Sequence, residues 1–166
     1  MYKDYTIKAK IDSGKEMEKA LAQLNSKFIG IDLQTDTYFE TSHGKLKLRQ
    51  GTIENLITHY ERIPDGEAEK TNVYRYDVNP TEEEIEKLKS SHRVIGIVEK
   101  ERKIYFIDHI KIHLDKLENE EEYIELEAID RLNQYSHEEL KRQCLDVKER
   151  LGIRESDIVQ TGYLKL

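Results

Sequence analysis

The stretch KLKLR at residues 45–49 alternates a cation with a leucine. Successive side chains of a β-strand point to opposite faces, so three cations would line one face and two leucines the other. Neighbouring cations would lie ~7 Å apart along the strand, so each could meet a different oxygen of a multiply charged anion. For one strand alone, however, a solvated charged face is the more ordinary explanation.

Charges at every second residue recur along much of the chain. The sets are Lys8 and Lys10; Lys45, Lys47 and Arg49; Lys100 and Arg102; Lys111, His113 and Asp115; and Glu125 and Glu127, with Arg62 and Arg75 as further cations on expected strands. Facing outward, they would decorate an ordinary sheet. Facing inward, they would line a tunnel with cations and a cluster of carboxylates. The charge pattern by itself leaves both arrangements open.

The inward arrangement has a definite chemistry. Cations neutralise and orient phosphate oxygens, and arginine does so with two parallel hydrogen bonds. Paired carboxylates such as Glu125 and Glu127 offer the hard oxygen ligands that Mg²⁺ or Mn²⁺ prefers. A metal held in this way polarises a phosphoryl oxygen or activates water.

The elements that would position these residues follow from periodicity and capping signals. Alternation predicts strands over residues 2–11, 34–41, 45–49, 53–63, 70–79, 93–100, 101–108, 110–115 and 122–129, and capping boxes predict helices over 13–27, 81–91 and 136–151. A bend is expected near residues 99–103, and the tail from 157 to 166 would add a last short strand or pack across the sheet. Short turns make the sheet largely antiparallel, and about eight strands are enough to close a barrel around a cavity.

Composition narrows the class of protein. The 166 residues predict a single domain, 1–166, and a net charge of −7 argues against a general nucleic-acid binder. One cysteine, Cys144, excludes an intramolecular disulfide and a Cys-based zinc site. The sequence has no signal-peptide core and no run of transmembrane length, so we expect a cytoplasmic protein without a membrane partner. The residues do not determine the oligomeric state, and a homodimer is kept as an expectation.

Seven short motifs, in order along most of the chain, carry a resemblance to a known family. They are IKAKID (7–12), QTDTYF (34–39), GKLKLR (44–49), HYER (59–62), VEKER (98–102), IHLD (112–115) and YIELE (123–127). Together they resemble the CYTH superfamily, the triphosphate tunnel enzymes that include class IV adenylate cyclases and thiamine triphosphatases. The resemblance implies an α+β fold with a closed or nearly closed eight-stranded antiparallel β-barrel and flanking helices. It also implies that the tunnel binds a triphosphate through basic residues and a divalent metal through acidic ones.

Charge pattern and resemblance together predict the site. Phosphate-binding residues would be Lys8, Lys10, Lys45, Lys47, Arg49, Arg62, Lys100, Arg102 and Lys111, of which Lys8, Arg62 and Lys100 would be catalytic; metal ligands would be Glu125, Glu127, Asp115 and Asp4. The family's opening motif is Glu-x-Glu-x-Lys, with Lys8 as its lysine. Here Asp4 stands in for the first glutamate and Thr6 replaces the second, and a neutral hydroxyl is a poor substitute for a carboxylate at a metal site.

Three functions remain open on this basis. The leading hypothesis is a metal-dependent enzyme that acts on ATP, thiamine triphosphate or tripolyphosphate, with Mg²⁺ or Mn²⁺. With water as nucleophile it would hydrolyse the triphosphate; with the ribose 3′-hydroxyl of ATP it would form cyclic AMP and pyrophosphate. The alternative, motivated by Thr6, is a catalytically weak module that binds polyphosphate or a phosphorylated metabolite. The third is a structural antiparallel protein with solvated charged faces.

Overall fold

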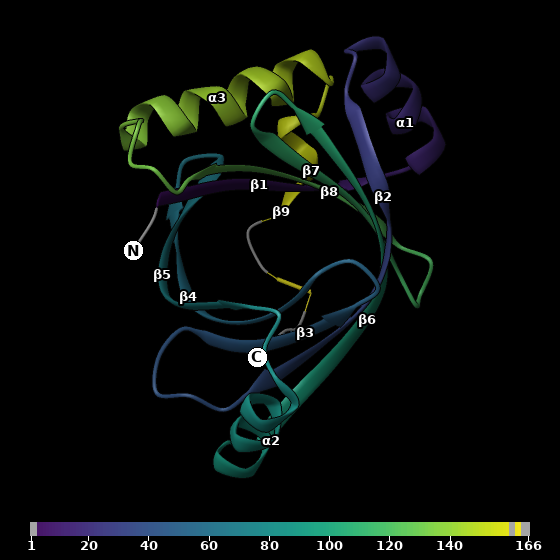
Figure 1. Ribbon diagram of the computed structural model, residues 1–166. Helices are drawn as coiled ribbons and strands as arrows, with labels where there is room; N and C mark the ends of the chain where they lie inside the picture. The colour runs from purple at the N-terminus through teal and green to yellow at the C-terminus, as the bar shows by residue number, and fades with distance from the viewer. Residues whose placement is uncertain (1–2, 160–161, 164–166) are drawn as a thin grey trace.

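The computed structural model describes residues 3–159 and 162–163, whose strands form a single antiparallel sheet closed into a barrel (Figure 1). The strands are β1 (Lys3–Ile11), β2 (Lys27–Phe39), β3 (Lys45–Gly51), β4 (Asn55–Asp65), β5 (Ala68–Val78), β6 (Val94–Ile107), β7 (Ile110–Leu117), β8 (Glu122–Asp130) and β9 (Ile158–Val159). The α-helices are α1 (Gly14–Gln23), α2 (Glu82–Ser91) and α3 (His137–Arg150), and a short 3₁₀ turn spans Glu155–Asp157.

The barrel closes because β1 has partners on both edges. β8 pairs with all nine residues of β1, and β5 pairs with Lys3–Thr6 on the other edge. β9 then occupies the rest of that edge, opposite Lys8 and Ala9. From β1 the order runs β5, β4, β3, β2, β6, β7, β8 and back to β1, with every pair antiparallel. The predicted α+β fold with a closed eight-stranded antiparallel barrel is therefore confirmed for the described residues.

Apolar side chains form two layers outside the barrel, each beneath helices. Ile7, Ile112 and Leu126 belong to the larger layer, which α1 and α3 cover with residues such as Leu21 and Leu140. The smaller layer is Phe39, Leu46, Leu48 and Ile57 beneath Leu88 of α2, on the opposite side of the barrel (Figure 1). Because the leucines of β3 lie in this outer layer, the alternating cations of the same strand must point inward.

The helices begin where the capping boxes predicted. The hydroxyl oxygens of Ser13, Thr81 and Ser136 each accept a hydrogen bond from the backbone N–H three residues later, at 3.2–3.3 Å. These caps satisfy amide groups that have no partner inside the helix. Among the described residues, none of the helices combines the length and apolar character needed to cross a bilayer.

Two strands differ from the prediction. β6 is one continuous strand of 14 residues, not two strands with a bend at 99–103. The charged run there looked like a break, but Lys100 and Arg102 find buried carboxylates inside while Glu99 is exposed. β2 begins at Lys27, where a helix was still expected, because α1 ends at Gln23 and Asn25 turns the chain with a positive φ of 56°.

The tail partly meets its prediction. β9 is the short last strand expected after residue 157, and it pairs with β1. Gly162 and Tyr163 lie inside the ring of strands, where the yellow end of the chain is drawn in Figure 1. The prediction for residues 160–161 and 164–166 lies outside the described residues.

Candidate functional site

The barrel encloses a cavity of about 500 Å³ lined by charged residues. Eight lysine and arginine side chains face it: Lys8, Lys45, Lys47, Arg49, Arg62, Lys100, Arg102 and Lys111. Seven carboxylates share its wall: Asp4, Asp36, Glu54, Glu61, Glu69, Glu125 and Glu127. The cations come from β1, β3, β4, β6 and β7, so strands distant in the sequence meet here. The inward arrangement of the charged faces is the one the protein adopts.

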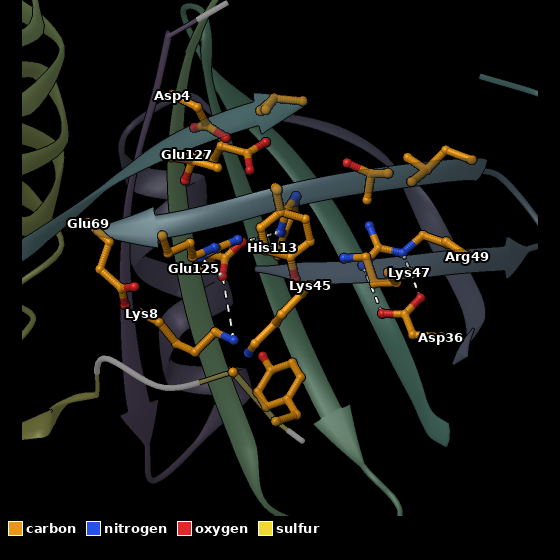
Figure 2. A pocket seen from close by; sticks show the side chains of 18 of the residues that line it. Asp4, Lys8, Asp36, Lys45, Lys47, Arg49, Glu69, His113, Glu125 and Glu127 are labelled. Carbon is orange, nitrogen blue, oxygen red and sulfur yellow. Dashed lines mark hydrogen bonds and ion pairs between the residues drawn. The ribbon is translucent and has the colours of Figure 1, made fainter. Parts of the chain in front are cut away.

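One end of the cavity is organised around Asp36. Its carboxylate accepts two hydrogen bonds from Arg49, both 2.9 Å, and a third from Lys100 at 2.5 Å (Figure 2). Asp36 and Arg49 are direct cross-strand neighbours on β2 and β3. Burial would raise the pKa of Asp36, but Arg49, Lys47 and Lys100 hold it well below its usual value. Asp36 is therefore ionised and fixes two of the predicted phosphate ligands.

Lys47 and Lys100 are buried lysines whose surroundings lower their pKa values. Burial and the neighbouring Arg49 lower the pKa of Lys47 well below its usual value, and Lys47 forms no ion pair with a described carboxylate. Burial, Arg49 and Arg102 lower the pKa of Lys100 to about 8. An anion bound here would stabilise both ammonium groups, since an opposite charge favours the charged form.

A second ion pair, between Arg102 and Asp115, lies beside this end. The guanidinium donates two hydrogen bonds to Asp115, of 2.7 and 2.8 Å, and the two residues face each other across β6 and β7. The Tyr163 hydroxyl donates a third to the same carboxylate, at 2.6 Å, and its ring centroid lies 3.6 Å from Nζ of Lys8. Asp115 is 2% exposed and does not line the cavity. Its oxygens are engaged, so it positions Arg102 and does not fit the predicted metal role.

Glu125 occupies the middle of the cavity. Its carboxylate lies 3.5 Å from the side-chain nitrogens of both Lys8 and Arg62, and 3.4 Å from Nδ1 of His113 (Figure 2). Burial would raise the pKa of Glu125, but Arg62 and Lys8 hold it well below its usual value. Burial and Arg102 lower the pKa of His113, whose two ring nitrogens lack a hydrogen-bond partner among the described residues. His113 therefore adds a neutral polar group to the cavity wall.

At the other end, carboxylates approach one another. Burial and the nearby Glu127 raise the pKa of Asp4 well above its usual value. Oδ1 of Asp4 is buried and has no hydrogen-bond partner among residues 3–159 and 162–163. Figure 2 shows the Asp4 and Glu127 side chains close together. Thr6 lies on β1, opposite Glu127 of β8, and its hydroxyl accepts a hydrogen bond of 2.9 Å from Arg62. In the described residues, no three Asp, Glu, His or Cys side chains already converge in metal-ligand geometry.

Most of the predicted site residues come together, and two do not. All the predicted cations line the cavity except Lys10, which is exposed and lies 3.8 Å from Glu121 at the barrel's end. Lys8 and Lys10 share a face, but the strand carries Lys10 past the cavity. Of the predicted metal ligands, Asp4, Glu125 and Glu127 line the cavity and Asp115 lies behind it.

Sequence reasoning missed four residues of the site. Asp36 was detectable, because it alternates with Gln34 and Tyr38 before the turn and faces Arg49 across the hairpin. Glu54 was missed because it lies in a turn, where side chains follow no periodicity. Burial would raise its pKa, but Lys111, His113 and Arg49 lower it to about 2. Glu69 precedes the expected start of its strand at residue 70. Tyr163 had no sequence signal, since only its contacts with Lys8 and Asp115 place it.

Comparison with known proteins gives the following. The sequence model of the CYTH domain matches residues 3–163. The PH1012 protein from Pyrococcus horikoshii OT3 is 28% identical with a TM-score of 0.81, each chain being covered to 96%. A conserved hypothetical protein from Pyrococcus furiosus is 22% identical with a TM-score of 0.80, over 96% of this chain and 97% of that one.

A third similar structure is HpAC1 from Hippeastrum, described as having a dominant triphosphatase activity. It is 13% identical with a TM-score of 0.62, over 98% of this chain and 92% of that one, so the likeness is one of fold. Among curated proteins, no significant relative of this chain is found.

Proposed function

Because the chain belongs to the CYTH domain family, we propose that it is a metal-dependent enzyme that binds a small molecule's triphosphate group in its cavity and hydrolyses it. The observation that carries this proposal is the gathering of eight lysine and arginine side chains around one cavity. Such a set serves a ligand with many anionic oxygens, because each cation can neutralise a different one. A solvated charged surface does not account for cations buried as deeply as Lys47, Lys100 and Arg102.

The side chains divide the work of binding. Arg49 and Arg102 are held by Asp36 and Asp115, so their remaining N–H groups are aimed before a ligand arrives. Lys47 has no such partner and is free to meet a phosphate oxygen directly. Fixed donors of this kind stabilise charge that develops on phosphoryl oxygens in the transition state, without reorganising during the reaction.

Lys8, Arg62 and Lys100 are the cations we propose to act on the reacting phosphate. Lys8 and Arg62 both lie beside Glu125, where the cationic and acidic ends of the cavity meet. Lys100 faces them from β6, and its ammonium group lies 5.7 Å from the ring of Tyr163, which also covers Lys8. A phosphate between these strands would contact all three.

The divalent metal that the family implies fits one part of the cavity. Eight cations nearly balance seven carboxylates, so a triphosphate brings negative charge that the cavity does not neutralise by itself. Asp4, with a buried unpartnered oxygen, and the adjacent Glu127 offer hard oxygen ligands for Mg²⁺ or Mn²⁺, with Glu125 next to them. When bound, such a metal would polarise a phosphoryl oxygen or activate water.

The test is a substrate panel. Tripolyphosphate, ATP and thiamine triphosphate are incubated with the protein and Mg²⁺ or Mn²⁺, and phosphate, pyrophosphate and cyclic AMP are followed. We expect phosphate release that EDTA abolishes. Cyclic AMP with pyrophosphate from ATP would instead identify a cyclase, which uses the same triphosphate grip. Absence of both turnover and tripolyphosphate binding would refute the proposal.

The second candidate is a binding module with little turnover, and Thr6 favours it. The opening strand offers one carboxylate, Asp4, where the family pattern has two. Calorimetric binding of tripolyphosphate without product formation at any metal concentration would support this candidate. If the protein released product about as fast as it bound tripolyphosphate, the binding-module candidate would be excluded.

A further inference from the structure

Thr6 has a glutamate on each side of it in the barrel wall. β1 lies between β5 and β8, and Thr6 is the cross-strand neighbour of Glu69 on β5 and of Glu127 on β8. Directly opposed residues in adjacent antiparallel strands have Cβ atoms about 5 Å apart and on the same face. Glu69 therefore places a carboxylate-bearing side chain on the same face of the wall, directly beside position 6.

Glu69 is a buried carboxylate that the rest of the site leaves without a partner. It is 6% exposed, lines the cavity, and forms no ion pair or side-chain hydrogen bond with another described residue. Burial and Glu125 raise its pKa, while Arg62 and Lys8 oppose that rise. In Figure 2 its carboxylate lies toward Lys8, apart from those of Asp4 and Glu127.

Three cavity carboxylates on the neighbouring strands β5, β1 and β8 have no ion pair among the described residues. Asp4, Glu69 and Glu127 all line the cavity, and none forms an ion pair with a described residue, whereas Asp36 and Glu125 are each held by two cations. Buried carboxylates are as a rule paired with cations or coordinate metals. Oδ1 of Asp4 is buried without a hydrogen-bond partner in the part of the chain that the structure describes, which is a second sign that this wall is incomplete without a cation.

We propose that Glu69 supplies, from the adjacent strand, the divalent-metal ligand that the opening strand lacks at Thr6, and that it acts with Asp4 and Glu127. The three carboxylates do not yet converge, so binding would draw them together through side-chain rotation. Glutamates suit this movement, because each has three rotatable side-chain bonds. This inference rests on the proposed function, since it names a ligand for the metal required there.

The experiment measures Mn²⁺ binding to the whole protein without substrate, by electron paramagnetic resonance of free Mn²⁺. Glu69→Gln is expected to weaken Mn²⁺ binding by at least about tenfold, the lower end of what losing a supporting group at a metal site costs. Thr6→Glu in the Glu69→Gln background is expected to restore most of the affinity, because it returns a carboxylate to the same face of the wall. Glu83→Gln, an exposed change of the same charge on α2, is the control and should leave binding unchanged.

Tripolyphosphate binding in EDTA distinguishes this inference from the proposed function. If wild-type protein binds neither tripolyphosphate nor Mn²⁺, the proposed function fails. If Glu69→Gln binds Mn²⁺ like wild type but binds tripolyphosphate more tightly in EDTA, Glu69 is a counter-ion for Lys8 and Arg62 and the inference is overturned. Wild type that binds tripolyphosphate but no Mn²⁺ also overturns it. Circular dichroism shows whether each variant is folded. If the double variant does not fold, Mn²⁺ binding by Glu69→Gln alone still tests whether Glu69 is a metal ligand.

Discussion

Arg49 and Lys47 are neighbouring cations on one strand face, yet they differ in what their loss would leave behind. Arg49 donates two of the three hydrogen bonds to the buried Asp36 carboxylate, and Lys100 donates the third. Removing one member of a buried ion pair costs about 3–5 kcal/mol when the other charge is left alone. Because Lys100 remains, we expect Arg49→Ala to reduce the free energy of unfolding by less than that in urea denaturation. Lys47→Ala removes no ion-pair partner from a described carboxylate, so it should change the free energy of unfolding much less.

Both variants should weaken tripolyphosphate binding, as measured by calorimetry. Lys47→Ala thus separates the two properties, with lost affinity at nearly unchanged stability. If Lys47→Ala bound tripolyphosphate like wild type, β3 would not be a wall of the phosphate site.

The pKa of Lys100 leads to a prediction of how tripolyphosphate binding depends on pH. Its pKa in the folded protein is about 8, lowered by burial, Arg49 and Arg102. Below that pH the ammonium is present, and above it the free protein must take up a proton before Lys100 can attract an anion. Affinity for tripolyphosphate should therefore fall as pH rises through about 8.

Lys100→Arg is the matched comparison, because arginine stays charged over this range. The ratio of wild-type to variant affinity cancels the ligand's own protonation and should decline between pH 7 and 9. A ratio independent of pH would show that Lys100 does not contact the bound phosphate.

At the scale of elements, β3 links the phosphate site to the outer apolar layer. Leu48 is fully buried beneath α2, and its neighbour Arg49 points into the cavity. Leu48→Ala should lower the free energy of unfolding by about 2–5 kcal/mol, as for other large-to-small core changes. Ile97→Ala, at a residue 60% exposed, should cost far less in the same urea titration.

The C-terminal segment places Gly162 and Tyr163 inside the barrel. Tyr163 belongs to none of the eight barrel strands, and its side chain contacts Asp115 and Lys8. Tyr163→Phe keeps the ring over Lys8 but removes the hydrogen bond that helps hold the Asp115–Arg102 pair. We expect weaker tripolyphosphate binding by calorimetry, whereas Tyr123→Phe, which loses only a bond to Glu121 at the surface, should bind normally. Tighter binding by Tyr163→Phe would show that the tyrosine competes with the ligand.

Alternation along each strand was enough to predict the inward cations, because period two is a local property of the chain. Lys8, Lys47, Arg49 and Arg102 were identified in this way. Which carboxylate each cation meets depends on strand register, and the Asp36–Arg49 and Arg102–Asp115 pairs each lie within one short hairpin. Lys8 meets Glu125, and Thr6 meets Glu69, because distant strands pair, which no local pattern encodes. Lys10 was misplaced for a related reason, since periodicity gives the face of a strand but not where the cavity ends.

For the whole molecule, a closed barrel means that eight strands hold the charged interior together from every side. The described cations and carboxylates of the cavity come from all eight of those strands and one turn between them. The site therefore depends on complete closure, and it cannot be assembled by one hairpin or one half of the chain.

Closure has a consequence for synthesis on the ribosome. β1 is made first, but its full-length neighbour β8 is among the last strands to emerge. Until residue 130 leaves the exit tunnel, β1 has only β5, which pairs with its first four strand residues. Contacts between distant segments form slowly because loop closure must come first. Ribosome-bound chains stalled before β8 emerges should expose β1 to protease, and chains stalled well after it should protect that strand. Of the barrel's strands, β1 would thus wait longest for its full-length partner, as an incompletely paired edge.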